Sequence, residues 1–197
     1  MSLQHLDISY LPVTPEAMQQ LAHGHWPVLT SLDLTSSFGS SDHSVNLKSV
    51  MKACRYFAAG NWPQLAIVEL AYNTLNGRNV RDLFCKPCRD LKTLPGLAIT
   101  SLNLSCNRNP SVVEGLAKAD LQHLQVLNLS RCNELDLCDN GLQEEGVKHL
   151  VKGQWPFLMQ LKVNFSFVNH VNTEALSQVL RSKWPKVVLD VPERTWV

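Results

Sequence analysis

The sequence lacks the features that assign many proteins to a class at once. No apolar run approaches the roughly 18 residues that a membrane-spanning helix needs, and residues 1–6 do not combine a basic with an apolar segment as a secretion signal does. Lysine and arginine number 18 against 17 acidic residues, so the chain has no strong field to attract nucleic acid or an anionic membrane. We therefore expect an intracellular, cytoplasmic protein that binds neither nucleic acid nor membrane.

Signatures of catalysis are missing as well. The chain contains no His-Glu-x-x-His, Gly-x-Ser-x-Gly or Gly-x-x-x-x-Gly-Lys motif, and its 7 histidines are scattered. Its 6 cysteines have no export signal beside them, so we expect reduced thiols rather than disulfides. These observations predict a protein that is not an enzyme, with no catalytic residues and no cofactor.

What the chain has instead is a repeated apolar pattern. Residues 153–163 follow the frame small-x-Trp-Pro-x-Leu-x-x-Leu-x-Val, which recurs three more times and in weaker forms. Each copy ends in alternating apolar residues, which are typical of a half-buried strand. The pattern predicts seven strands, the last compressed into residues 187–191 and the others centred on Leu6, Leu32, Val68, Leu102, Leu127 and Leu161.

Helical spacing precedes each Trp-Pro pair. Apolar residues lie eight, five and four positions before each tryptophan, which predicts a helix with one narrow apolar face. The four sets are Met18, Leu21 and Ala22; Cys54, Phe57 and Ala58; Val147, Leu150 and Val151; and Leu176, Val179 and Leu180. The tryptophan itself is expected to seal one apolar layer, and the proline to direct the chain into the next strand.

The ends of these helices carry their own signals. Thr14 and Asn109, each followed by proline, and Asn172 predict N-caps. Gly24, Gly60 and Gly153 fall where a left-handed C-terminal cap is expected. Each unit is therefore a strand, a turn and a helix, which buries its apolar face only by stacking on its neighbours.

The pattern Leu-x-x-Leu-x-Leu-x-x-Asn, clearest at Leu65, Val68, Leu70 and Asn73, resembles the leucine-rich repeat family, in particular its intracellular, ribonuclease-inhibitor-like members. The resemblance implies an α/β fold: a curved right-handed solenoid with a parallel β-sheet on the concave face and helices on the convex face. It covers residues 1–197 as a single domain of about seven repeats. Because the chain begins directly in a strand, we expect that an N-terminal cap is lacking.

Three of the predicted repeats are longer than the others. Leu6 to Leu32 and Leu102 to Leu127 span 26 and 25 residues, whereas the other intervals span 34 or 36. We expect the extra residues in surface loops at 38–44, around 85–90 and at 131–138. Insertions of this kind tend to gather on one face, often the binding face, although neutral loop growth explains them equally well.

The resemblance places the polar residues of each strand on the concave face. The residue between the last two apolar positions changes from acidic to basic along the chain: Asp7, Asp33, Glu69, Asn103, Asn128 and Lys162. Small residues follow, and beyond them the chain carries Tyr10, Tyr72, Arg131 and Phe165. These residues form a candidate groove for a protein or peptide with a basic segment. The alternative is a polar, solvated strand face.

Two further groups of residues are candidates for a structural or a chemical role. Asn73, Asn107 and Asn140 occupy the family's asparagine position, with Ser37, Cys132 and Ser166 as substitutes, and their amides are expected to satisfy turn backbone groups. Cys85-Lys86-Pro87-Cys88 is a weak metal or redox candidate. A closed zinc site needs four ligands, and only Cys54 or Cys106 suggest themselves as additions.

We therefore carry three hypotheses from the sequence. The first is a non-enzymatic protein-protein interaction module that binds on its concave face or inserted loops. The second is a metal- or redox-active protein that uses Cys85 and Cys88. The third is a structural piece of a longer array, whose N-terminal edge associates with further repeats or with another copy.

Overall fold

The structure is a computed structural model that describes residues 2–38, 47–84, 98–107, 109, 111–130, 144–163 and 173–190. Strands and helices alternate through these residues. The strands are β1 (His5–Asp7), β2 (Ser31–Asp33), β3 (Ile67–Glu69), β4 (Ser101–Asn103), β5 (Val126–Asn128), β6 (Gln160–Lys162) and β7 (Val188–Asp190). The helices are α1 (Pro15–His23), α2 (Leu47–Ala59), α3 (Gly77–Phe84), α4 (Ser111–Ala117), α5 (Glu144–Leu150) and α6 (Thr173–Lys183).

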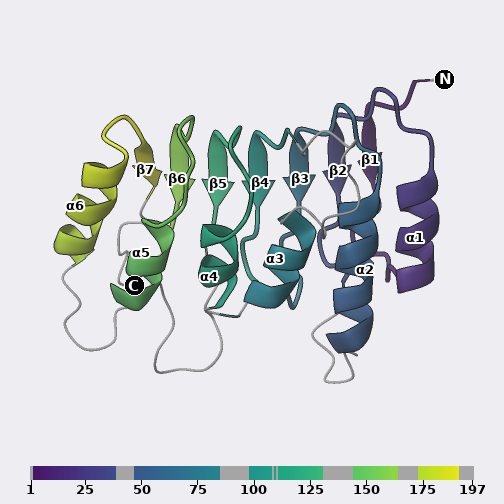
Figure 1. Cartoon of the computed structure of the whole chain (residues 1–197), viewed down its shortest axis with the longest axis horizontal. Coiled ribbons are helices and arrows are strands. Elements are labelled where there is room, and N and C mark those ends of the chain that lie inside the picture. The colour runs from purple at the N-terminus through teal and green to yellow at the C-terminus, as the bar shows by residue number, and fades with distance from the viewer. Residues whose placement is uncertain are drawn as a thin grey trace, which may run out of the picture.

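The seven strands of the described residues form one parallel sheet in sequence order. Figure 1 shows them side by side from β1 to β7, with the helices as a second row beside the sheet. The predicted central residues are in register from Leu6 through Leu32 and Val68 to Leu189. The α/β class, the parallel pairing and the strand positions are thus confirmed.

The core lies between the sheet and the row of helices. The central strand residues Leu32, Val68, Leu102, Leu127 and Leu161 are at most 1% exposed, and they pack with the apolar helix faces in one cluster. Because side chains alternate along a strand, the residues on either side of each central position project from the opposite face of the sheet. We call this face the open face.

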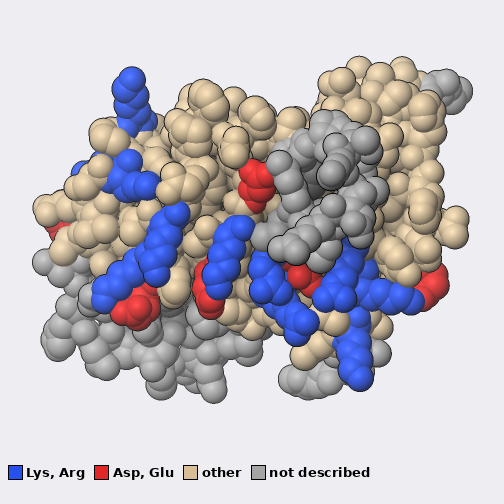
Figure 2. Space-filling model, viewed as in Figure 1, with Lys and Arg blue, Asp and Glu red and all other residues tan. Residues whose placement is uncertain are grey.

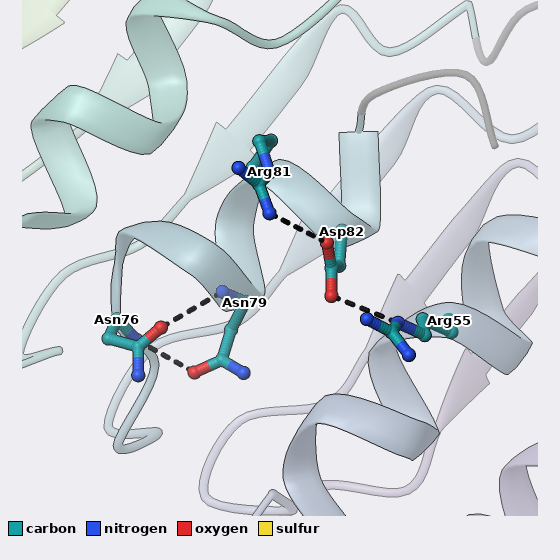
Figure 3. A network of polar contacts seen from close by, with 5 residues as sticks. All are labelled: Arg55, Asn76, Asn79, Arg81 and Asp82. Atoms are coloured by element: carbon teal, nitrogen blue, oxygen red, sulfur yellow. Dashed lines mark hydrogen bonds and ion pairs between the residues drawn. The ribbon is translucent and has the colours of Figure 1, made fainter. Parts of the chain in front are cut away.

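Several helix starts follow capping chemistry. Thr14 Oγ1 accepts a hydrogen bond from the Ala17 N–H, with Pro15 at the first helical position, as predicted. The start of α3 was not predicted. There Asn76 and Asn79 each accept the other's backbone N–H, both at 3.0 Å, so the pair forms a reciprocal cap (Figure 3).

Two contacts hold α3 in the row. Asp82 accepts from Arg55 Nε of α2 at 3.1 Å and lies 3.6 Å from Arg81 of its own helix (Figure 3). On its other side α3 approaches α4 so closely that a Cβ on Gly115 would collide with the Gly77 carbonyl, and one on Gly77 with the Ser111 carbonyl. These two glycines set the spacing of the helices.

The prediction of left-handed glycine caps is wrong. Gly24 has φ −63° and ψ 161°, which is extended backbone, and neither Gly60 nor Gly153 has a positive φ. Instead a tryptophan indole lies against each glycine: a Cβ at Gly60 would come within 2.5 Å of Trp62, and one at Gly153 within 2.6 Å of Trp155. Glycine is needed here for the space that it leaves.

Two smaller expectations are also wrong. Phe38, predicted to lie in a surface loop, is 1% exposed and belongs to the core, because removing an aromatic ring from water is favourable. Val179 was placed on the apolar face of α6 but is 46% exposed. Within the described residues no helix follows α6, so one flank of that helix is uncovered.

The apolar residues around β1 are less buried than those in the middle of the molecule. Leu3 and Leu11 are 44% and 57% exposed, and Leu6 is only partly buried, whereas Leu32 in the next strand is fully buried. In the described residues β1 pairs with β2 alone.

None of the described helices combines the length and the apolar character that crossing a membrane requires.

Candidate functional site

The candidate binding residues of the sequence lie in rows across the open face. Asp7 is in register with Asp33, Asp33 with Glu69, and Glu69 with Asn103. We call Asp7, Asp33 and Glu69 the acidic row. The same row continues through Asn128 to Lys162, and the register extends to Asp190 of β7.

Most of this row also has a structural task, which the sequence did not reveal. The side-chain oxygens of Asp7 and Asp33 accept the backbone N–H two residues later, both at 2.8 Å. Asn103 and Asn128 do the same at 3.0 Å. Short side chains of this type close such turns. The preference for Asp or Asn is therefore explained by the turn, whereas the negative charge at Asp7 and Asp33 is not.

Glu69 differs from its neighbours, because its longer side chain is half-buried and is linked to Asn103 rather than to its own turn. Burial raises the pKa of the Glu69 carboxyl above its usual value, with a further contribution from the negative charge of Asp33, while the hydrogen bond with Asn103 acts in the opposite direction. At Asp7 the hydrogen bonds from Ser9 lower the pKa. The negative charge of Asp33 therefore acts on Glu69 across the two adjacent strands.

The turn after each strand carries backbone strain. Tyr10, Ser36, Tyr72 and Cys106 have φ between 54° and 60°, a left-handed conformation that is rare for aromatic residues. The strand hydrogen bonds continue into the turn and hold it, as in Tyr72 N–H to the Ser105 carbonyl at 2.9 Å. Tyr10 and Tyr72 are 74% and 53% exposed, so two aromatic side chains project from strained positions.

Small residues lie between the acidic row and these turns. Ala71 and Ser105 are buried, and Ser9, Thr35 and Ser130 are partly buried. The structure therefore brings Asp7, Asp33, Glu69, Asn103, Asn128 and Lys162 into one row with the turn tyrosines at its edge. Arg131 and Phe165 lie outside the described residues.

The helix side of the molecule has a different charge pattern. Lysines and arginines are spread over the helices, several of them beside an acidic residue (Figure 2). Four of these pairs are Lys52–Glu16, Arg55–Asp82, Lys118–Glu114 and Lys148–Glu145, at 2.6 to 3.2 Å. By contrast, no described lysine or arginine forms an ion pair with Asp7, Asp33 or Glu69.

Asn73 and Asn107 have the structural role expected of them. Asn107 donates to the Leu70 and Leu104 carbonyls at 2.8 and 2.9 Å and accepts from the Leu75 N–H at 3.1 Å. Asn73 makes the same three bonds one unit earlier, and Ser37 Oγ donates to the Ile8 and Thr35 carbonyls. Each side chain therefore joins two neighbouring units. Asn140, Cys132 and Ser166 lie outside the described residues.

The cysteine hypothesis concerns residues that the structure mostly leaves undescribed. Cys85 and Cys88 lie outside the described residues. Cys54, a possible additional ligand, is fully buried in the core. Burial, helped by the charge of Asp82, raises the pKa of its thiol far above the usual value, so this thiol stays protonated and unreactive. Among the residues that the structure does describe, no three His, Cys, Asp or Glu side chains gather closely enough to hold a metal ion.

A comparison of the sequence with protein-family models and with curated proteins gave no match.

Proposed function

We propose that the chain is a non-enzymatic protein-protein interaction module of the leucine-rich repeat type, which binds a basic segment of a protein partner on its open face. The observation that carries the proposal is the acidic row. Its three carboxyl groups lie in register on adjacent strands, on a face that no described helix covers. Among the described residues they have no lysine or arginine partner of the kind that the helix carboxylates have.

Two features support the repeat family. The buried Asn73 and Asn107 bridge successive units through the same three hydrogen bonds, which is the task that the family's asparagine implies. Neighbouring strands are also about 4.8 Å apart, whereas packed helices need about 8–10 Å. A row of strands stacked against a row of helices therefore bends toward the strands, and the open face becomes the concave face.

The chemistry of the open face indicates what it would bind. Like charges on adjacent strands repel each other, so a lysine or arginine of a partner would relieve that repulsion between Asp33 and Glu69. The exposed rings of Tyr10 and Tyr72 offer rigid apolar area of the kind that is enriched at protein interfaces. The small residues between them leave room for a partner's side chains.

A capture experiment with two triple variants tests the proposal. Asp7→Asn, Asp33→Asn and Glu69→Gln together remove three negative charges, and asparagine keeps the turn bonds, as Asn103 and Asn128 demonstrate. Glu16→Gln, Glu114→Gln and Glu145→Gln remove the same charge from the helices, where the carboxylates are ion-paired. Partners captured from a lysate are then compared by mass spectrometry.

We expect the helix variant to retain the partners of the wild type and the acidic-row variant to lose those with basic segments. Equal capture by all three proteins would contradict the proposal. Circular dichroism of each variant checks that the fold is unchanged. The hypothesis of a metal or redox role for Cys85 and Cys88 stays a prediction, which a zinc assay of the wild type and of Cys85→Ser addresses.

A further inference from the structure

A groove lies at the turns that lead from α5 to β6 and from α6 to β7. It has a volume of about 490 Å³ and is lined by the Trp-Pro turns 155–156 and 184–185, with Leu158 and Val187 between them. The indoles of Trp155 and Trp184 are stacked, with ring centroids 5.5 Å apart and planes 15° from parallel. The groove is therefore an apolar, rigid surface at the edge of the sheet, separate from the acidic row.

Trp155, one of the two tryptophans that line this groove, differs from the tryptophans of earlier units. Trp26 Nε1–H donates to the Leu21 carbonyl at 2.7 Å, and Trp62 Nε1–H to the Phe57 carbonyl at 2.8 Å, each five residues back. Trp155 is 1% exposed, yet within the described part of the chain its buried Nε1–H has no acceptor.

The cause is the orientation of the ring. A Cβ on Gly60 would meet Nε1 of Trp62 first, whereas a Cβ on Gly153 would meet Cη2 of Trp155 first. The indole of Trp155 is thus turned so that its six-membered ring, not its N–H, lies closest to the glycine. Buried polar groups normally have a partner, so within the described residues this N–H is an exception among the tryptophan indoles of these turns.

The charged residues that the structure describes around the groove are positive. Lys183 and Lys186 are exposed at its rim, Gln122 and Gln154 contribute amides, and no acidic residue is among the described lining residues. Figure 2 shows lysine or arginine side chains in the same end of the molecule, over α6 and β7. The charge thus favours an anionic ligand.

Exposed apolar residues extend the groove over the neighbouring turn. Phe157 and Met159, which flank the lining residue Leu158, are 58% and 55% exposed. The Phe157 ring lies parallel to that of His123, with centroids 6.5 Å apart. An apolar area that continues beyond a groove is typical of a site for a polypeptide rather than for a small molecule.

We propose that this groove binds an acidic peptide segment with an apolar anchor. The anchor side chain packs against the Trp-Pro turns at 155–156 and 184–185, and acidic residues beside the anchor pair with Lys183 and Lys186. This surface and the open face select opposite charges, so two different segments can be bound at once.

The test uses the peptide acetyl-Asp-Glu-Leu-Phe-Asp-Glu-amide and the ¹H–¹⁵N signals of the tryptophan indoles. We expect the peptide to shift the signals of Trp155 and Trp184, which Trp155→Phe and Trp184→Phe assign. Those of Trp26 and Trp62 serve as internal controls, because their N–H groups are bonded within their own units.

Charge variants complete the experiment. Lys186→Glu should weaken peptide binding by about tenfold, whereas Arg78→Glu, the same change on α3, should leave the affinity within about twofold. The variant that neutralises the acidic row should bind the peptide as the wild type does. This last arm separates the groove from the function proposed for the open face.

Three results would overturn the proposal. The first is a peptide that shifts no indole signal, or all of them alike. The second is equal binding of a peptide in which lysine replaces every acidic residue. The third is a free aromatic carboxylate that shifts Trp155 while the peptide does not, which would make the groove a site for a small molecule.

Discussion

At the scale of single residues, buried polar side chains decide how the units fit together. Asn107 is fully buried and makes three hydrogen bonds, two of them to the preceding unit. Without its amide, two carbonyls and one N–H would be left without that partner inside the protein. The cost of a buried unsatisfied group exceeds the gain from an ordinary hydrogen bond, so this position contributes more to stability than its size suggests.

We predict that Asn107→Ala lowers the free energy of unfolding by about 2–3 kcal/mol. Urea denaturation measures the change. Asn61→Ala is the control, because Asn61 is exposed and its loss should cost less than about 0.5 kcal/mol. Similar losses at both positions would show that Asn107 does not have the bridging role described above.

Tyr72 links strain to binding. Its φ of 54° is disfavoured for a tyrosine, whereas asparagine adopts this conformation more readily. We therefore predict that Tyr72→Asn leaves the free energy of unfolding unchanged or raises it by up to about 1 kcal/mol, while it weakens the capture of partners. Urea denaturation measures the free energy of unfolding, and capture from a lysate measures partner binding. A destabilised variant would show that the tyrosine ring contributes more than the strain costs.

Glu69 should make stability depend on pH. Its pKa is raised above the ordinary 4.5, so the folded protein holds this proton more tightly than the unfolded chain does. Below about pH 4.5 the Glu69 carboxyl is protonated in both the folded and the unfolded state, so it does not change the free energy of unfolding. As the pH rises through the raised pKa, ionisation of the partly buried carboxyl lowers the stability of the folded state. Glu69→Gln should therefore match the wild type near pH 4 and exceed it at pH 7, by at most about 1 kcal/mol.

Thermal unfolding at both pH values checks this difference. Glu114→Gln is the control with the opposite sign, because hydrogen bonding and charge from Lys118 lower the pKa of Glu114. That variant should be less stable than the wild type above about pH 4.5, and the difference should shrink as the pH falls through the lowered pKa of Glu114.

At the scale of helices and strands, the close approach of α3 and α4 explains a glycine that helix propensity does not favour. Alanine is favoured over glycine within a helix by about 1 kcal/mol, yet Gly115 lies inside α4. The reason is the backbone of α3, whose Gly77 carbonyl occupies the place of a Cβ on Gly115. Backbone yields less easily than a side chain, so the two helices would have to separate.

We predict that Gly115→Ala destabilises the protein by about 1–3 kcal/mol, the usual cost of overpacking. Propensity alone predicts the opposite sign, so the direction of the change in a urea titration decides between the two. Ser182→Ala in α6, where Ser182 is exposed, is the control and should change stability by less than about 0.5 kcal/mol.

The same scale shows what the sequence can and cannot reveal. The apolar positions around Leu32, Val68 and Leu102 repeat along the chain, so strand positions and register could be predicted. The space available around a residue in the fold does not produce a repeating pattern in the sequence. Gly153 was interpreted as a turn residue because its contact with Trp155 exists only in three dimensions, and the burial of Phe38 was missed for the same reason.

At the scale of the whole molecule, the two long surfaces have different chemistry. The helix side carries many lysines and arginines (Figure 2), several of which pair with carboxylates within or between helices. The open face carries the acidic row, which has no such partner among the described residues. The sequence located this row correctly, but it could not reveal that Asp7 and Asp33 also close their turns. That second task makes asparagine, rather than lysine, the appropriate substitution.

The affinity of a captured partner, measured by isothermal titration at low and physiological salt, tests the central claim most directly. For the wild type and for the variant Glu16→Gln, Glu114→Gln and Glu145→Gln we predict the same affinity, which falls as salt rises. The variant Asp7→Asn, Asp33→Asn and Glu69→Gln should bind about tenfold or more weakly, with less dependence on salt. Equal affinity of all three proteins would show that the acidic row is not where the partner binds.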